Sequence, residues 1–345
     1  MVFILSFLYL ELKYYKYIYM YKTKSYYSSL KGKRESNEDS HCIMNNKVNY
    51  FWGVYDGHGG KAVSEYLGKH MAPAFLNSIH KDGYKIPEIK GIFDNIQKRL
   101  IIDSKKENFN IRDVGSTCLV AILTGNKIQI ANSGDCRAVI CQDKGLAKAL
   151  TIDHKPDWSL EKKRIEKLGG KIEHDKEDDV YRIMDLSVSR AFGDLDYSAY
   201  VNHMPDVFTH TLRSTDEFLI LACDGLWDEA CSQDAVNFVL QNKDKVPNIA
   251  LALGKWAINE KGSQDNVSVV VIFFEKRIQK IRNRSVKRKS NGKTRPVTSV
   301  SKISKISNIR KKSINRKKQN KTEPVKKGSN IKKKSAKRNK ILKKP

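Results

Sequence analysis

Cysteine is scarce in this chain of 345 residues, and its spacing excludes two common classes of site. None of the six cysteines forms a Cys-x-x-Cys pair, and four of them lie in apolar, strand-like segments where a reduced, buried thiol is the ordinary state. A chain of this length does not need disulfides to fold, and the usual spacing of zinc ligands is missing. We therefore expect a reducing compartment, without a disulfide framework or a structural zinc site.

Acidic and aromatic residues are almost absent from residues 276–345. This segment holds 29 Lys and Arg against a single acid, Glu323, and no aromatic residue follows Phe274. With so few apolar residues it cannot bury a core, so we predict a disordered basic tail. The formal net charge of +27 belongs to this tail, because the rest of the chain carries 36 basic and 37 acidic side chains. Residues 26–275 are therefore predicted to form a near-neutral globular domain of ordinary size.

The chain also lacks an apolar run long enough to span a membrane. Residues 2–10 are mostly apolar, but Glu11, Lys13 and Lys16 interrupt the run. No basic residue precedes it and no small-residue cleavage site follows, which disfavours a signal peptide. We expect residues 1–25 to be an N-terminal extension, with a targeting signal as the alternative.

Apolar periodicity divides the central domain into blocks of strands and blocks of helices. The predicted strands cover residues 26–47, 49–55, 115–123, 127–131, 137–141, 218–223 and 267–274. The predicted helices cover residues 63–75, 89–100, 156–168, 230–240 and 248–259. Residues 115–141 have the pattern of a meander, and residues 173–179 that of a charged loop. Blocks without strict alternation favour antiparallel sheet with helices packed outside, an α+β arrangement, over a Rossmann fold.

One stretch joins a strand to the residue types of a catalytic site. The apolar residues 50–55 end abruptly in Asp56, Gly57 and His58. The carboxylate offers a hard oxygen ligand, the glycine allows close approach of the backbone, and the imidazole can transfer a proton near neutral pH. Taken alone, an Asp-Gly pair at the end of a strand is more often a simple turn.

The same pattern recurs along the chain, which weakens the turn interpretation. Further acids follow strand-like runs or stand beside glycine or asparagine, namely Glu38, Asp135, Asp224 and Asp265, and Asp228 lies four residues after Asp224. Gathered carboxylates suit Mg²⁺ or Mn²⁺, and the absence of soft ligands from these motifs speaks against zinc. Two such ions could activate water for in-line attack on phosphorus. A nearby arginine such as Arg34 could hold the phosphoryl oxygens.

The ordered set of motifs resembles the metal-dependent Ser/Thr protein phosphatases of type 2C (PPM-type). The motifs are Arg34-x-x-x-Glu38-Asp39, Asp56-Gly-His-Gly-Gly60, Gly115-Ser-Thr117, Ser133-Gly-Asp-Cys-Arg-Ala138, Leu150-Thr-Ile-Asp-His-Lys-Pro156, Val188-Ser-Arg-Ala-Phe-Gly-Asp194, Cys223-Asp-Gly-Leu-Trp-Asp228 and Gly262-Ser-Gln-Asp-Asn266. They cover about residues 26–275. The resemblance implies two packed antiparallel β-sheets flanked by α-helices, a four-layer αββα sandwich. It also implies hydrolysis of phosphoserine and phosphothreonine in proteins.

The resemblance further implies a binuclear Mg²⁺ or Mn²⁺ centre. Its ligands would be Glu38, Asp56, Gly57 (through its carbonyl), Asp224 and Asp265. Asp56 would bridge both ions. A third ion, held by some members of the family, would use Asp135 and Asp228 together with Asp224. Since no ligand is missing from this set, the resemblance disfavours an inactive relative.

Catalytic roles follow from the same resemblance. Arg34 would bind the substrate phosphate, and His58 would be the general acid that protonates the leaving serine or threonine oxygen. Residues 156–182 match the flap, a segment beside the site where sequence varies and substrate choice is tuned.

The main alternative is a phosphatase-like binding or scaffold protein associated with nucleic acid through its tail. A flexible basic segment attracts polyanions such as nucleic acid or acidic proteins, and simple solubilisation is the competing interpretation of the tail. The clusters at residues 311–318 and 332–338 resemble nuclear-localisation patches. We expect a cytoplasmic or nuclear monomer that acts on phosphoproteins.

Overall fold

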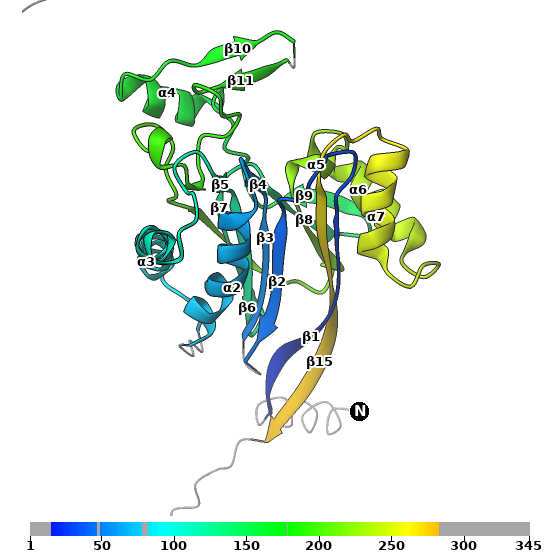
Figure 1. The fold of residues 1–345 in the computed structure, drawn as a ribbon. Helices are drawn as coiled ribbons and strands as arrows, with labels where there is room; N and C mark the ends of the chain where they lie inside the picture. The colour runs from blue at the N-terminus through cyan, green and yellow to red at the C-terminus, as the bar shows by residue number, and fades with distance from the viewer. Residues whose placement is uncertain (1–14, 47–48, 78–81, 178, 283–345) are drawn as a thin grey trace, which may run out of the picture. The chain divides into compact units, whose positions relative to one another are not determined.

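The structure, a computed structural model, describes residues 15–46, 49–77, 82–177 and 179–282 (Figure 1). Two five-stranded antiparallel sheets form its centre. The first has the order β1 (Tyr15–Leu30), β15 (Val267–Arg282), β14 (Phe218–Ala222), β8 (Arg137–Gln142) and β9 (Leu146–Ala149). The second has the order β13 (Asp206–Thr211), β7 (Lys127–Ser133), β6 (Cys118–Thr124), β3 (Asn49–Tyr55) and β2 (Ser40–Asn45).

Alternating side chains let each sheet contribute to two apolar layers. On β15, Val270 and Ile272 belong to the core between the sheets, whereas Val269 and Val271 belong to the core beneath the outer helices. The helices over this first sheet are α5 (Asp224–Trp227), α6 (Ser232–Asn242) and α7 (Ile249–Asn259). Valine and isoleucine suit this doubly buried strand because their branched side chains pack well on a pleated surface.

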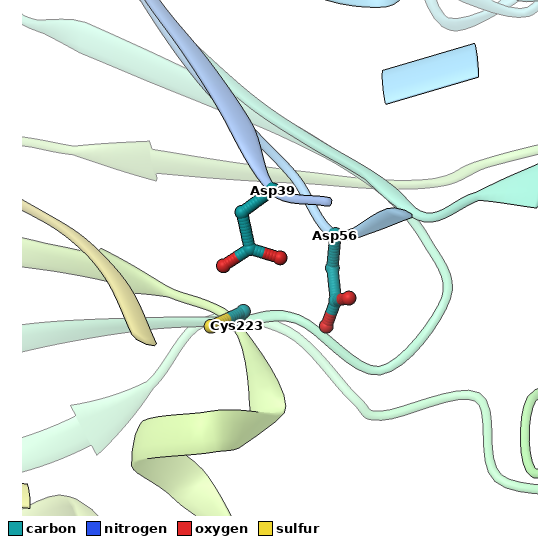
Figure 2. Close-up of side chains that lie close together, drawn as sticks. All are labelled: Asp39, Asp56 and Cys223. Carbon is teal, nitrogen blue, oxygen red and sulfur yellow. The ribbon is translucent and has the colours of Figure 1, made fainter. Parts of the chain in front are cut away.

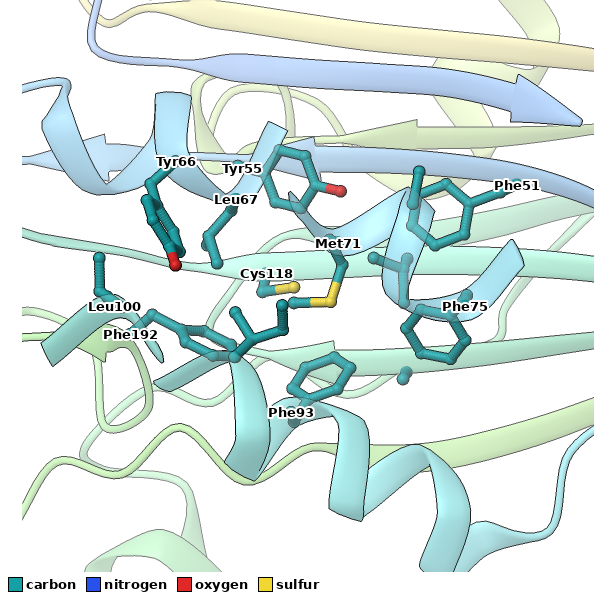
Figure 3. Close-up of a cluster of buried hydrophobic side chains, with 14 of the residues drawn as sticks. Phe51, Tyr55, Tyr66, Leu67, Met71, Phe75, Phe93, Leu100, Cys118 and Phe192 are labelled. Atoms are coloured by element: carbon teal, nitrogen blue, oxygen red, sulfur yellow. The ribbon is translucent and has the colours of Figure 1, made fainter. Parts of the chain in front are cut away.

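The second sheet is covered by α2 (Ala62–Leu76) and α3 (Ile86–Glu107), which pack on its outer face (Figure 3). Phe51 from β3 packs with Phe75 from α2, whose ring also meets Phe93 from α3 edge-on. Each of these phenylalanines is fully buried, which stabilises the fold by roughly 2–3 kcal/mol per side chain. The neighbouring Trp52 instead faces the core between the sheets. The four layers confirm the predicted αββα sandwich.

Shorter elements surround the end of the sandwich that carries the acidic motifs. A small sheet joins β12 (Phe192–Gly193), β5 (Gly115–Ser116) and β4 (Gly57–His58), and a 3-10 turn follows at Leu195–Tyr197. The flap contains α4 (Ser159–Lys167) and a hairpin of β10 (Glu173–Asp175) and β11 (Val180–Arg182). The prediction of a plain charged loop over residues 173–179 was therefore wrong. The hairpin was missed because its short strands are rich in charged residues and show little apolar alternation.

Two further expectations need correction. The predicted meander at residues 115–141 crosses between sheets, because β6 and β7 pair in one sheet while β8 pairs with β14 in the other. The domain limits expected at residues 26 and 275 both fall inside the long β1–β15 pair, which runs from Leu30↔Val267 to Tyr15↔Arg282. Residues 15–25 and 276–282 thus belong to the first sheet. Residues 1–14 and the tail from 283 onward lie outside the described residues.

Candidate metal centre and active site

Asp56 stands where β3 ends, and its backbone is fixed by Thr117. The Asp56 N–H donates to Thr117 Oγ1 at 3.1 Å, and the Thr117 N–H donates to the Asp56 carbonyl at 2.9 Å. This double link explains why the Gly115-Ser-Thr117 motif accompanies the Asp-Gly-His motif. Its effect is to hold one carboxylate at the junction of the two sheets.

Asp224 and Asp135 reach the same place from other strand ends. Asp224 follows β14 and begins the single turn α5, while Asp135 lies in the turn between β7 and β8. Carboxylate oxygens of Asp56, Asp135 and Asp224 all lie within 4.8 Å of one another. The sequence predicted that these acids meet, and the fold brings them together because β3, β7 and β14 end at the same edge of the sandwich.

Asp39 forms a second cluster with Asp56 and Cys223, whose ligand atoms also lie within 4.8 Å (Figure 2). The resemblance implies that the neighbouring Glu38 is a ligand, and this role stays a prediction. In the structure the Glu38 side chain accepts from the Gly60 N–H at 2.9 Å and from Ser36 Oγ at 3.0 Å. It therefore braces the loop after β4, and Asp39 supplies the carboxylate beside Asp56. The adjacent Glu-Asp pair was visible in the sequence, but its spacing alone could not tell which side chain points inward.

Asn266 positions the whole loop that carries these residues. Its Oδ1 accepts from the Glu38 N–H at 2.8 Å, and its Nδ2 donates to the carbonyls of Lys31 and Ser36 at 2.8 and 2.9 Å. Gly32 packs so closely that an added Cβ would lie 2.0 Å from the Asp265 carbonyl oxygen, and its φ of +62° also favours glycine. The sequence analysis gave Asn266 no role, although its motif contained it.

Arg34 and Asp265 form the rim of the site. Arg34 Nη2 lies 2.8 Å from Asp265 Oδ2, and both side chains are partly exposed. They line an open pocket together with Asp224, Asp228, Glu229 and Ser263. The structure thus places the predicted phosphate-binding arginine beside the predicted metal ligands. Gly57, the remaining predicted ligand, packs against the Glu38 carbonyl, where an added Cβ would lie at 2.3 Å.

The cluster carries more negative charge than its cations neutralise. Burial raises the pKa of Asp56 well above its usual range, and Asp224 and Asp39 raise it further. Burial also raises the pKa of Asp224, with Asp135 and Asp228 adding to the shift. Carboxylates arranged in this way gain stability when a cation joins them. One cation is already present, since Lys155 contacts Asp135 at 2.7 Å. Burial lowers the pKa of Lys155, but Asp135, Asp224 and Asp228 outweigh it and hold the pKa above its ordinary value.

His58 is held by a buried carboxylate that the sequence analysis did not single out. Its Nε2 lies 2.8 Å from Oδ2 of Asp194, whose side chain is 1% exposed. Gly115 allows this approach, because an added Cβ there would lie 2.1 Å from Asp194 Oδ2. Since a carboxylate accepts hydrogen bonds, Nε2 carries the hydrogen and Nδ1 is the nitrogen left for chemistry. Asp194 was visible only as the last residue of its motif.

The base of the flap holds a second ionic network, and its charges are matched. Glu161, which is almost fully buried, contacts Arg164 and Arg190, each at 2.7 Å. Arg190 also contacts Asp206 at 3.0 Å, and Asp206 lies 3.1 Å from His154 Nε2. Together the two arginines hold the pKa of Glu161 down to about 2, against a burial effect that would raise it. This network ties α4 to β13.

His154 links that network to the acid cluster. Its Nδ1 accepts from the Gly134 N–H at 3.1 Å, next to Asp135, so Nε2 carries the hydrogen donated to Asp206. The fully buried ring therefore orders the backbone of the flap and of the Asp135 turn.

The sequence profile of the family described as Protein phosphatase 2C matches residues 24–267. The chain belongs to the protein phosphatase 2C family. It is 38% identical over 256 residues to Probable protein phosphatase 2C 69 from Arabidopsis thaliana. The aligned residues cover 73% of this chain and 70% of that protein. It is 45% identical over 172 residues to the PP2C-like domain-containing protein R307 of Acanthamoeba polyphaga mimivirus, covering 43% of this chain and 95% of that protein.

Solved structures support the fold of this protein phosphatase 2C. The serine-threonine phosphatase 2C from Toxoplasma gondii superposes with a TM-score of 0.65 at 23% identity, covering 74% of this chain and 99% of that one. The family match and the curated relatives confirm the resemblance seen in the sequence. The protein is a metal-dependent Ser/Thr protein phosphatase, and the alternative of a non-catalytic scaffold finds no support. Among the described residues, no helix is both long and apolar enough to cross a membrane.

Proposed function

We propose that this phosphatase hydrolyses phosphoserine and phosphothreonine at a binuclear Mg²⁺ or Mn²⁺ centre built on Asp56. The observation that carries this proposal is the convergence of Asp56, Asp135 and Asp224 within 4.8 Å, with Asp39 beside Asp56. Carboxylate oxygens gathered in this way fit hard divalent cations. Asp265 would complete the set from the rim, and the family to which the chain belongs depends on Mg²⁺ or Mn²⁺. When bound, such ions lower the pKa of a water molecule and neutralise charge on a phosphoryl group.

Three side chains of the chain would do the remaining work. Arg34 would bind phosphoryl oxygens, because a guanidinium has five N–H donors and the contact with Asp265 uses only part of them. His58 would donate a proton from Nδ1 to the leaving oxygen. Asp194 would hold the imidazole in place through Nε2, so that Nδ1 faces the reacting group.

Hydrolysis of a phosphothreonine peptide tests this proposal. We expect turnover that requires Mn²⁺ or Mg²⁺, that EDTA abolishes, and that Asp224→Ala lacks. The matched control is Asp244→Ala, which removes an exposed carboxylate outside the site and should leave turnover unchanged. Turnover that persists in EDTA, or in well-folded Asp224→Ala protein, would reject the proposed centre.

We further propose that the basic segment, predicted at residues 276–345, directs a monomeric enzyme to acidic partners or nucleic acid in the cytoplasm or nucleus. Its charge supports this, since 29 basic residues oppose one acid. A truncation after Arg282 would keep β15 whole and remove most of the charge. We expect the truncated protein to lose binding to a model polyanion at low salt. It should still hydrolyse the peptide and should sediment as a monomer. Unchanged polyanion binding would reject the proposed role of this segment.

A further inference from the structure

The ammonium group of Lys155 lies among the three carboxylates of the implied third-ion site. Lys155 Nζ is 2.7 Å from Asp135 Oδ2, 3.5 Å from Asp228 Oδ2 and 3.8 Å from Asp224 Oδ2. A cation of the protein itself therefore occupies the position that the family resemblance gives to an added ion. The two cations cannot share these carboxylates, because like charges at such distances repel strongly.

We propose that Lys155 acts as a tethered cation that fills the third-ion site, so that a third divalent ion binds only after the lysine side chain withdraws. This inference rests on the binuclear centre proposed above. It concerns the site's third position and leaves the roles of Asp56 and Asp265 unchanged.

Asp135 is built to keep a cation beside it. The residue is 1% exposed, and its Oδ1 has no hydrogen-bond partner in the described part of the chain. A buried carboxylate without a cation is costly, and the remaining oxygen still needs a partner. The backbone cannot simply carry Asp135 away, because the adjacent Gly134 N–H is held by His154 Nδ1. Some cation must therefore stay close to Asp135.

Lys155 can meet this need and can also leave. It follows His154, whose ring is fixed by Gly134 on one side and Asp206 on the other, so the start of the side chain is anchored. Its four-carbon stem is of a flexible kind, and the exposed Asp228 lies on the side of the site that opens to solvent. A tethered group competes at a high effective concentration, whereas Mg²⁺ gives up its water reluctantly. The lysine is therefore favoured until the divalent ion is abundant.

Counting the Mn²⁺ ions bound per chain tests this inference without measuring activity. Equilibrium dialysis of the full-length protein over a range of Mn²⁺ would compare Lys155→Gln with the wild type. We expect the dissociation constant of the weakest site to fall at least about tenfold in Lys155→Gln, because the competing charge is gone. Lys155→Arg, which keeps a cation, should titrate nearly as the wild type does. Lys163→Gln removes an exposed flap lysine outside the site and should change nothing.

A double variant separates the site from a general change in charge. Adding Asp135→Asn to Lys155→Gln should abolish the extra ion, while a circular dichroism spectrum confirms that the fold is intact. The inference is overturned if Lys155→Gln binds Mn²⁺ as the wild type does, or if Lys155→Arg gains the ion as well. A wild type that hydrolyses the peptide would then show that only the inference fails. A wild type that binds no Mn²⁺ would overturn the metal centre together with the inference.

Discussion

The acid cluster and the base of the flap are both buried ionic sites, yet they balance charge differently. Around Asp56 the carboxylates crowd together and raise one another's pKa, with Lys155 as the cation among them. At the flap, Glu161 and Asp206 face Arg164 and Arg190, so each carboxylate has a guanidinium partner. The first arrangement is unstable until a further cation arrives, whereas the second is complete by itself.

The difference separates a binding site from a structural anchor. In a matched network each charge already has a partner, so a further ion adds no stability. Its residues serve to hold α4 against β13. In an unmatched network the carboxylates repel one another, and a bound cation relieves that repulsion. Cation binding therefore stabilises the folded state. Replacing one carboxylate by its amide in each site should therefore have opposite effects on stability.

The largest expected effect is on activity, in Asp56→Asn. We expect phosphatase activity to fall on the order of 10³-fold or more, because the carboxylate on which the proposed centre is built is lost. The metal-free variant should nevertheless be more stable than the metal-free wild type by about 1–2 kcal/mol, since one crowded charge is gone. Peptide hydrolysis and urea unfolding in EDTA measure the two quantities. A variant that is destabilised in EDTA would contradict the account of stored repulsion.

The second prediction makes the same chemical change at the flap. Glu161→Gln leaves Arg164 and Arg190 without their shared charge, and we expect a loss on the order of 3 kcal/mol in the free energy of unfolding. Urea unfolding in EDTA again provides the measurement, so that the two variants are compared under one condition. An unchanged midpoint would show that the flap base is not a matched structural network.

The third prediction concerns the pH dependence of that loss. The folded-state pKa of Glu161 is depressed to about 2 from an ordinary value of 4.5, so its stabilisation is fully present above pH 4.5. It is lost as the pH falls through the folded-state pKa. The difference in unfolding free energy between wild type and Glu161→Gln should thus be constant from pH 7 to 5 and shrink from pH 4.5 toward pH 2. A difference that grows on acidification would contradict the assigned direction.

The smallest effect is expected at an exposed ion pair on the flap hairpin. His174 Nε2 lies 2.9 Å from Asp179 Oδ1, but the Asp179 side chain is 91% exposed. Asparagine tolerates the φ of 55° found there, so Asp179→Asn tests the charge alone. We expect the free energy of unfolding to change by less than about 0.5 kcal/mol. A larger loss would mean that exposed pairs also anchor the flap.

Local pattern predicted antiparallel sheet with helices packed outside, and the family resemblance implied the four-layer sandwich and the gathering of the acids. Apolar runs marked β3, β14 and β15, and the acids at the strand ends had to converge once these strands packed. The limits of the domain were harder. The first eleven residues of β1 place Tyr15, Tyr17, Tyr19 and Tyr21 in strict alternation, a strand-like pattern that the predicted limit at residue 26 missed. Their place in the first sheet follows from their pairing with β15.

The inward residue of the Glu38-Asp39 pair could not be predicted either. Which carboxylate faces Asp56 depends on the loop held by Asn266, a contact across 228 residues of sequence. Asp194 was hidden for the same reason, since its partner His58 lies 136 residues earlier. Side-chain direction in loops is set by tertiary contacts, and motif spacing carries no record of them.

The long β1–β15 pair also decides where the folded domain can be joined to other chain. β15 starts beside Asp265 at the catalytic centre and ends at Arg282, where it pairs with Tyr15. At about 3.3 Å per residue, the strand carries the chain about 50 Å from the site. Residues 15 and 282, the two ends of the long strand pair, are therefore neighbours, and both lie far from the active site. A fusion or a surface attachment made there would leave the approach of substrates open, and a short linker between residues 15 and 282 would allow a circularly permuted enzyme.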